Sequence, residues 1–320
     1  MTRHHPALDG TRNPGGGNAP NDPNDPGLAH DTIVHTAQAE ASALSGVYRD
    51  TLGTFLHASS AVPLPRAARA LYGLARLRQW HAIDLHAGES CAAGNWQALQ
   101  TGVIEGVAAN HALALHRELW AGGTRRLAHE RDMALQVAMV ITLGWNDLAR
   151  FLLQTWFGKD SGLTGGKPLT GVDGMIVRIA GEALDVPVAH AIFRRSDSLL
   201  RKVVHHWRDT SDDVARLGGK FADRHLLQCR LDTGDQLYEF DHPVEQAMPV
   251  EILMLLRLRG CACVPRWLRE HAAFQHPAAT LGPVGTPGQS DRCAEFIRRS
   301  KRLLPHYAAF DDALTRQMHA

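Results

Sequence analysis

Apolar residues recur every three to four positions along most of this chain, which is the period of an amphipathic helix. The first such pattern follows a potential N-cap at Asp31 or Thr32 and predicts a helix that runs to about residue 57. Its apolar positions are Val34, Ala37, Ala41, Leu44 and Val47. No long stretch alternates between apolar and polar residues as a strand would. The pattern therefore predicts a helical protein.

Proline and glycine residues predict where the next helices begin and end. Pro65 stands where the first turn of a helix tolerates a residue without an N–H, and this second helix is expected to run to about His86. A third helix is expected over residues 96–120, closed by a pair of glycines. A long helical segment over residues 125–157 follows, which Gly144 either kinks or divides into two helices.

The second half of the chain continues this pattern. Pro249 is expected to begin a strongly apolar helix over residues 250–259, and Gly260 to end it. We expect this helix in the core, because an exposed apolar patch of that size promotes aggregation. Further helices are expected at residues 175–184, 188–209, 211–231, 265–274 and 291–304.

Composition divides the chain into a tail and a domain. Residues 1–30 consist largely of Gly, Pro, Asn, Asp and His, with too few aliphatic residues to offset the entropy lost on ordering, so a disordered tail is expected. Residues 31–320 are expected to form a single all-α domain of packed antiparallel helix hairpins, either bundle-like or a short repeat. Its clearest loops lie near residues 158–174 and 275–290.

Charge and cysteine content indicate which partners and which cellular compartment to expect. Lys and Arg number 34 against 33 Asp and Glu, which gives no bulk electrostatic reason to expect nucleic acid or a membrane as the main partner. The five cysteines are odd in number and scattered, as is typical of reduced thiols. No signal-peptide core occurs near the start, and the most apolar run, residues 133–145, is far shorter than the roughly 20 residues of a membrane span. A cytoplasmic protein is expected.

The candidate metal-binding and phosphate-binding motifs do not have the residue spacing or the residue types that such sites require. His81 and His86 of HAIDLH lie about 140° apart around a helix, so they do not share a face as metal ligands. In GLTGGKP, Lys167 is followed by Pro168 and not by the Ser or Thr of a phosphate-binding loop. We therefore expect no catalytic set, no metal site and no cofactor.

Two groups of basic residues raise the question of nucleic-acid binding. The arginines of the second helix are expected on its solvated face; these are Arg66, Arg69, Arg76 and Arg78. The RRSKR run of residues 298–302 has no interleaved aromatic residue on which bases would stack. Direct binding of nucleic acid is not expected.

Two segments carry a resemblance to a known class of proteins. LGWNDLARFL, residues 143–152, and EFDHPVEQAMPVEILMLLRLRG, residues 239–260, resemble the all-α immunity proteins of bacterial polymorphic-toxin and type VI secretion systems. The resemblance implies a non-enzymatic cytosolic antidote that binds a cognate toxin and occludes its active site.

Many such toxins are nucleases with basic clefts, so the resemblance directs attention to acidic clusters as the partner-binding residues. These are Asp209, Asp212 and Asp213, and then Glu239, Asp241 and Glu245. Helix capping is the alternative explanation for both clusters. The near-zero net charge argues against an antidote that acts chiefly by mimicking nucleic acid.

Two other functions fit the same helical pattern. A helical-repeat adaptor would display regular hairpins with a continuous concave surface. The Trp–x–x–Leu pattern recurs near Trp96 and Trp145, but at a spacing longer than a tetratricopeptide repeat and without a third copy. A helical enzyme would instead have a closed pocket in which histidines or carboxylates converge.

Overall fold

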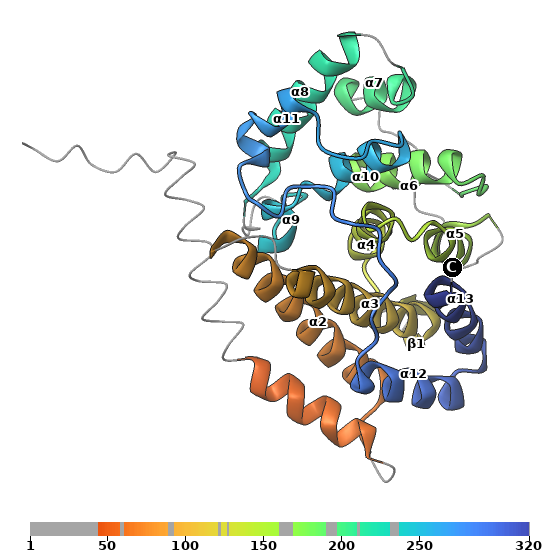
Figure 1. Ribbon diagram of the computed structural model, residues 1–320. Helices are drawn as coiled ribbons and strands as arrows, with labels where there is room; N and C mark the ends of the chain where they lie inside the picture. The colour runs from red at the N-terminus through yellow and green to blue at the C-terminus, as the bar shows by residue number, and fades with distance from the viewer. Residues whose placement is uncertain are drawn as a thin grey trace, which may run out of the picture.

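The computed structural model describes residues 44–57, 61–88, 93–120, 123–126, 128–159, 169–189, 197–209, 212–230 and 237–319. Across these residues the fold is all-α, as predicted, with helices packed against one another (Figure 1). The first described helix covers residues 44–56. The expected tail of residues 1–30 and the first part of the helix expected from residue 31 lie outside the described residues.

The two longest helices form the base of the fold. Helices α2 (Leu64–Gly88) and α3 (Ala93–Leu115) pack side by side along their lengths (Figure 1). Pro65 lies in the first turn of α2, as predicted. A Cβ on Gly102 would lie 2.9 Å from Cγ of Gln79, so glycine at this position permits the close approach of the two helices. The Gln79 amide consequently donates to the carbonyl oxygen of Gly102 at 3.0 Å.

A short hairpin replaces the end of the expected third helix. That helix ends at Leu115, and strands β1 (Arg117–Trp120) and β2 (Gly123–Arg126) then pair in antiparallel register. The prediction of helix up to residue 120 and again from residue 125 was therefore wrong. Two-residue connections between antiparallel strands favour glycine, so a glycine pair marks a hairpin as readily as it marks a helix end.

The long helical segment after the hairpin is divided, which was one of the two predicted outcomes. Helix α4 (Glu130–Thr142) ends just before Gly144, and helix α5 (Asn146–Phe157) begins just after it. Gly144 has φ of +81°, where glycine is favoured, and a Cβ there would also lie 2.7 Å from Cγ2 of Val284. Both constraints select glycine at the turn.

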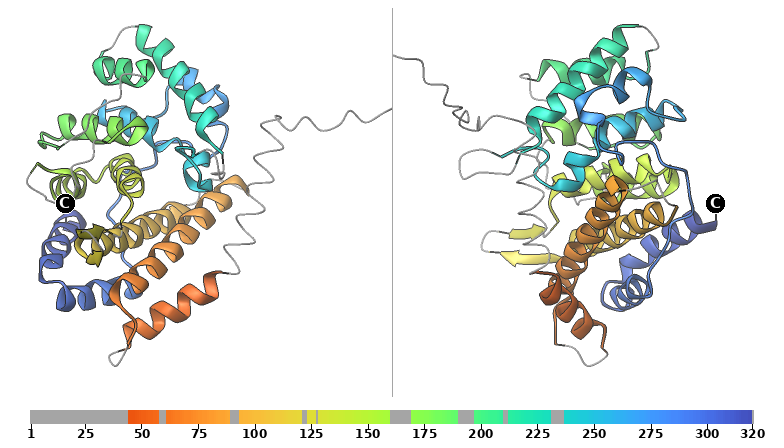
Figure 2. Two further views of the ribbon diagram at one scale, coloured as in Figure 1. Left: turned by 180° about the vertical axis from the view of Figure 1, so that it is seen from behind. Right: turned by 60° about the vertical axis from the view of Figure 1, so that its left-hand side comes forward.

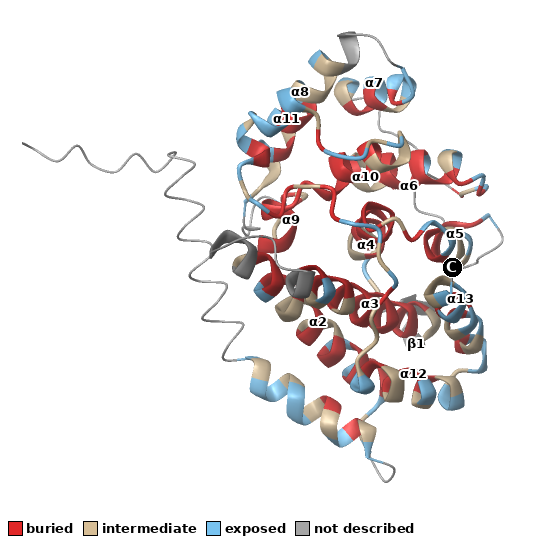
Figure 3. Ribbon diagram, viewed as in Figure 1, coloured by how far each residue is buried: buried red, intermediate tan, exposed pale blue. Residues whose placement is uncertain are grey.

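The core is centred on α4, and its side chains are buried from Met133 through Thr142. Helix α4 packs against α3, α5, α6 (Gly171–Ala183) and α10 (Val250–Leu258), and Figure 3 shows these helices buried where they meet. The expectation that α10 belongs to the core is confirmed, since its residues 250–256 are all buried. Part of the expected loop at residues 158–174 is instead the first turn of α6.

Five further helical segments cover one end of this core in the described part of the chain (Figures 1 and 2). They are α7 (Ser198–His206), α8 (Asp212–Gln228), α9 (Pro243–Ala247), α11 (Arg266–Arg269) and the 3₁₀ turn η1 (Ala272–Phe274). The helix expected from Val188 does not begin there, because Val188 forms an isolated bridge with Gly158. Within the described residues α7 begins at Ser198, where the side chain of Asp197 accepts a hydrogen bond from the Leu200 amide at 3.1 Å.

The C-terminal segment returns to the base of the fold. Residues 275–290 contain neither helix nor strand and lead to α12 (Asp291–Leu303), η2 (Pro305–Tyr307) and α13 (Ala308–His319). Helix α12 and η2 contact α3, and α13 packs on α5 (Figure 1). Helix α13 was absent from the sequence-based expectations.

Candidate functional site

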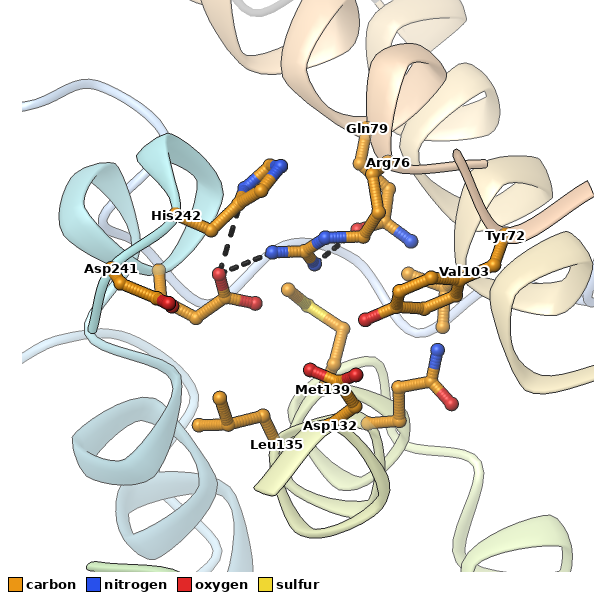
Figure 4. Close-up of a pocket in the computed structure, with 11 residues that line it drawn as sticks. Tyr72, Arg76, Gln79, Val103, Asp132, Leu135, Met139, Asp241 and His242 are labelled. Atoms are coloured by element: carbon orange, nitrogen blue, oxygen red, sulfur yellow. Dashed lines mark hydrogen bonds and ion pairs between the residues drawn. The ribbon is translucent and has the colours of Figure 1, made fainter. Parts of the chain in front are cut away.

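A polar pocket of about 210 Å³ opens between α2, the first half of α4 and the start of α9 (Figure 4). Most of the polar side chains that line it are ionisable. These ionisable residues are Tyr72, Arg76, Asp132, Asp241, His242 and Glu245. Because they come from three parts of the chain that are far apart in sequence, only the packed fold brings them together.

Helical spacing explains how each element presents its residues to the pocket. Tyr72, Arg76 and Gln79 are four and three positions apart, so they share one face of α2. Asp132 lies in the first turn of α4, where the helix dipole favours an acid. At the start of α9, Nδ1 of His242 accepts a hydrogen bond from the Val244 amide at 3.2 Å and so caps that helix.

An internal ion pair forms one wall of the pocket. Nη2 of Arg76 binds Oε2 of Glu245, and Nη1 of Arg76 donates to Oε1 of Gln79 at 2.8 Å. The side chains of Arg76 and Glu245 are only 12% and 4% exposed. Burial alone would lower the pKa of Arg76, but Glu245 and Tyr72 outweigh it and the pKa is raised, so the guanidinium stays charged. The prediction that Arg76 lies on a solvated face was wrong.

His242 completes this wall in its neutral form. Its Nδ1 lies 3.7 Å from Oε2 of Glu245. Burial and the positive charge of Arg76 together lower the pKa of His242 well below its usual range. A neutral ring is consistent with its role as the acceptor that caps α9.

Asp132 lies opposite the ion pair and lacks a cation of its own. Its carboxylate is hydrogen-bonded to the hydroxyl group of Tyr72, and burial raises the pKa of both groups. Among the residues that the structure describes, no Arg or Lys lies at ion-pair distance from Asp132. The pocket therefore holds a desolvated carboxylate that feels the nearby charge of Arg76 but forms no ion pair among the described residues.

A second buried carboxyl group, that of Asp173 on α6, lies within electrostatic range of Asp132. Burial and the nearby charge of Glu239 raise the pKa of Asp173 to about 7, and within the described part of the chain its Oδ1 has no hydrogen-bond partner. Glu239 itself is paired, since Nη2 of Arg224 lies 2.9 Å from its Oε1 and that oxygen also accepts from the Val172 amide at 3.0 Å. The carboxyl group of Asp173 therefore lies within electrostatic range of both Glu239 and Asp132.

The structure places the predicted partner-binding residues at two separate sites. Asp241 and Glu245 line the pocket, and Asp241 lies 3.7 Å from Arg131. Glu239 lies behind it in its pair with Arg224. Asp209 lies elsewhere, at the end of α7, where it is half-exposed and 2.8 Å from Nδ1 of His206.

Asp212 and Asp213 begin α8, but their side chains lie outside the described residues. The sequence analysis missed Tyr72, Asp132 and Asp173 as members of the candidate site. One signal in the sequence could have identified Asp132. It is an acidic residue in the first turn of a helix whose next ten residues are mostly apolar. Nothing in the sequence pairs that helix with α2 or α9.

Comparison with known proteins adds no further information on the site. No family model matches this chain, and no curated protein or solved structure is similar to it. None of the helices in the described ranges has both the length and the apolar character needed to cross a membrane. The described residues also contain no group of three or more His, Cys, Asp or Glu side chains placed to hold a metal ion.

Proposed function

We propose that this protein is a non-enzymatic antidote that binds a cognate toxin in the cytoplasm, and that its acidic pocket receives a basic side chain of that toxin. The observation that carries the proposal is the carboxylate of Asp132, which lies buried in the pocket without a cation of its own. The resemblance to immunity proteins supplies the class of partner.

The charges of the pocket favour a cationic guest. Asp132, Asp241 and Glu245 contribute three carboxylates to its lining, and Arg76 contributes one guanidinium that Glu245 already binds. A Lys or Arg side chain entering the pocket would give Asp132 the counter-charge that it lacks. Close charge pairs in desolvated interfaces have coupling energies of about 1.5 to 7 kcal/mol, which is sufficient to dominate the specificity of an interface.

A nuclease toxin is a suitable source of such a side chain. Nucleases bind phosphate backbones with lysine and arginine residues, and an antidote that binds one of these residues would block the cleft. A pocket that binds a single side chain does not require an acidic protein overall. The proposal therefore agrees with the net charge of +1.

The test is co-expression with the polypeptide encoded next to this gene, scored by growth rescue and by co-purification of the complex. Asp132→Asn keeps the shape of the side chain and removes its charge. We expect the substitution to weaken the complex at least about tenfold, which corresponds to about 1.4 kcal/mol. Asp147→Asn is the matched control, because Asp147 is 61% exposed on α5 and pairs with Arg150 at the surface.

Two results would contradict the proposal. One is that the wild-type protein neither rescues growth nor forms a complex with the neighbouring gene product. The other is that Asp132→Asn and Asp147→Asn bind the toxin equally well, which would place the interface away from the pocket.

A helical enzyme is the second candidate, and one observation favours it. Tyr72, Asp132 and His242 converge in a single pocket, which is the feature expected of the enzyme alternative. All three groups are already engaged, since Tyr72 is bound to Asp132 and His242 caps α9. Screening the purified protein for hydrolysis of ester and phosphoester substrates tests this candidate, with Tyr72→Phe as the variant expected to lose any turnover that depends on the pocket.

A further inference from the structure

Two adjoining cavities lie away from the acidic pocket, near α7 and α10. One is apolar and measures about 280 Å³. The other measures about 500 Å³ and lies beside the C-terminal ends of α6, α7 and α10. Trp207 and Arg259 line both cavities, so the two spaces share a boundary.

Aromatic and aliphatic side chains form the apolar cavity. Its lining includes Val203, Trp207, Phe221, Leu255, Leu256 and Trp267. Trp267 is 40% exposed, and its ring lies so close to Gly218 of α8 that a Cβ at that position would collide with it. Because glycine at 218 admits the indole ring, the wall of the cavity is formed by packed side chains and not by a chance gap.

Arginine residues dominate the second cavity. Arg208, Arg257 and Arg259 line it together with Asn146, and no carboxylate side chain is part of its lining. Arg208 lies over the ring of Trp207 at 4.7 Å and pairs with Glu182 at 3.5 Å. The other two arginines have no carboxylate partner within the described residues.

Backbone carbonyl groups hold these two arginines in position. Arg257 donates to the carbonyl oxygens of Thr142 at 3.0 Å and Gly282 at 2.6 Å, and Arg259 donates to that of Asp209 at 2.7 Å. Burial lowers the pKa of Arg257, as expected for a cation without a counter-ion. Guanidinium groups fixed in this way suit the oxygen atoms of a phosphate or carboxylate group.

We infer that the two cavities form one site for a free amphiphilic anion, whose acidic head lies among Arg208, Arg257 and Arg259 and whose apolar tail fills the space beside Trp207 and Trp267. The charge of one cavity and the apolar lining of the other specify the two ends of this ligand. The size of the apolar cavity limits the tail to one short chain, as in an alkyl phosphate or a fatty acid. This site is separate from the acidic pocket, so the inference does not depend on the antidote proposal.

Isothermal titration of the full chain with octyl phosphate, below the concentration at which it aggregates, tests the inference. Inorganic phosphate supplies the head alone, and octanol supplies the tail alone. We expect octyl phosphate to bind at least about tenfold more tightly than either fragment, because it occupies both cavities. Equal or weaker binding of octyl phosphate would overturn the inference.

Substitutions in each cavity test which end of the ligand binds there. Arg259→Gln is expected to weaken the binding of octyl phosphate at least about tenfold and to leave the binding of octanol unchanged. Trp267→Ala is expected to weaken the binding of octyl phosphate and to leave the binding of inorganic phosphate unchanged. Arg266→Gln is the control, since Arg266 is 86% exposed, pairs with Glu270 and neighbours Trp267 in sequence. The circular dichroism spectrum and melting temperature confirm that each variant is folded.

Two further outcomes would also overturn the inference. In the first, Arg266→Gln weakens octyl phosphate as much as Arg259→Gln does, which would indicate attraction to surface charge in general. In the second, the protein binds vesicles of anionic phospholipid but not octyl phosphate, which would indicate a membrane-binding surface and not a site for a free amphiphile.

Discussion

Buried ionisable residues are the most informative single residues in this protein. His225 on α8 and Glu251 on α10 are fully buried, with Nδ1 of the ring 2.8 Å from Oε1 of the carboxylate. Burial alone would lower the pKa of His225, but the charge of Glu251 and the neighbouring Cys229 outweigh it and raise the pKa to about 10. The core therefore contains a charged pair at neutral pH, and removing one partner leaves the other unpaired.

Glu251→Gln is expected to lower the free energy of unfolding at pH 7 by about 3 to 5 kcal/mol, because it removes one partner of a buried pair. The pair also makes stability depend on pH. The folded pKa of His225 lies above the unfolded value of about 6.5, so the stabilisation is complete below pH 6.5 and declines as pH rises towards 10. Urea unfolding at several pH values should show this decline in the wild type and not in Glu251→Gln.

The exposed pair of His206 and Asp209 provides the control for this experiment, since both side chains are about half exposed. Asp209→Asn should change the free energy of unfolding by less than about 1 kcal/mol. If Glu251→Gln were no more costly than Asp209→Asn, the buried pair would not contribute to stability as argued.

The raised pKa of Asp173 predicts a second pH dependence of the free energy of unfolding. Its pKa of about 7 in the folded protein lies above the ordinary value of 3.8, so the folded state holds a proton that the unfolded chain has already lost. The free energy of unfolding should therefore fall as pH rises from about 4 to about 7. Asp173→Asn removes this slope and should raise stability at pH 8 by roughly 1 to 3 kcal/mol relative to the wild type. An equal pH dependence in both proteins, measured by urea unfolding, would refute this.

At the scale of the elements, the backbone conformation of glycine decides where helices end. Gly260 follows α10 with φ of +73°, and nothing lies within 4 Å of the position that its Cβ would take. Gly219 lies in the middle of α8, also in open space, but without a positive φ. The two positions therefore differ in backbone conformation and not in crowding.

Alanine should have opposite effects at these two glycines. Gly260→Ala is expected to lower the free energy of unfolding by about 1 to 2 kcal/mol, because an L side chain is strained at positive φ. Gly219→Ala is expected to raise it by about 0.5 to 1 kcal/mol, because alanine favours the helix more than glycine does. Denaturant unfolding of both variants measures the difference, and effects of the same sign would contradict the argument.

At the scale of the whole molecule, the C-terminal segment is anchored on helices α3 and α5. Tyr307 of η2 is fully buried, and its hydroxyl group donates to the carbonyl oxygen of Ala108 on α3 at 2.7 Å. The ring of Phe310 on α13 lies 5.4 Å from that of Tyr307, and Phe310 also packs against Phe151 of α5. Contacts between residues about two hundred positions apart thus hold α13 to the rest of the fold.

Tyr307→Phe is expected to lower the free energy of unfolding by about 0.5 to 1.5 kcal/mol, because it removes the buried hydrogen bond from the Tyr307 hydroxyl group to the carbonyl oxygen of Ala108. Tyr48→Phe is the matched control, since the half-buried ring of Tyr48 packs on Gly73. Its effect should be within about 0.5 kcal/mol. Thermal unfolding followed by circular dichroism measures both variants, and a loss of stability no larger in Tyr307→Phe than in Tyr48→Phe would contradict the proposed link.

Local signals in the sequence predicted many of the helices correctly. They did not predict the candidate site as a whole. Pro249 and Gly260 marked the limits of α10 correctly because they act on the backbone next to them. The glycine pair after Trp120 was misread, since the same local signal serves a hairpin and a helix end. Asp241 and Glu245 were identified as acidic residues of interest, but Asp132 and Tyr72 were not, because they reach the pocket only through the packing of α2, α4 and α9.

The sequence alone therefore determined the all-α class and the apolar helix of the core, because hydrophobic periodicity and backbone preferences act over a few residues. Only the tertiary structure decided which charges are paired. Arg76 is an unremarkable arginine of α2 in the sequence, and its buried contact with Glu245 joins residues 169 positions apart. The environment of an ionisable group depends on what the fold places around it, so the acidic pocket and the arginine-lined cavity follow from packing and not from any local pattern.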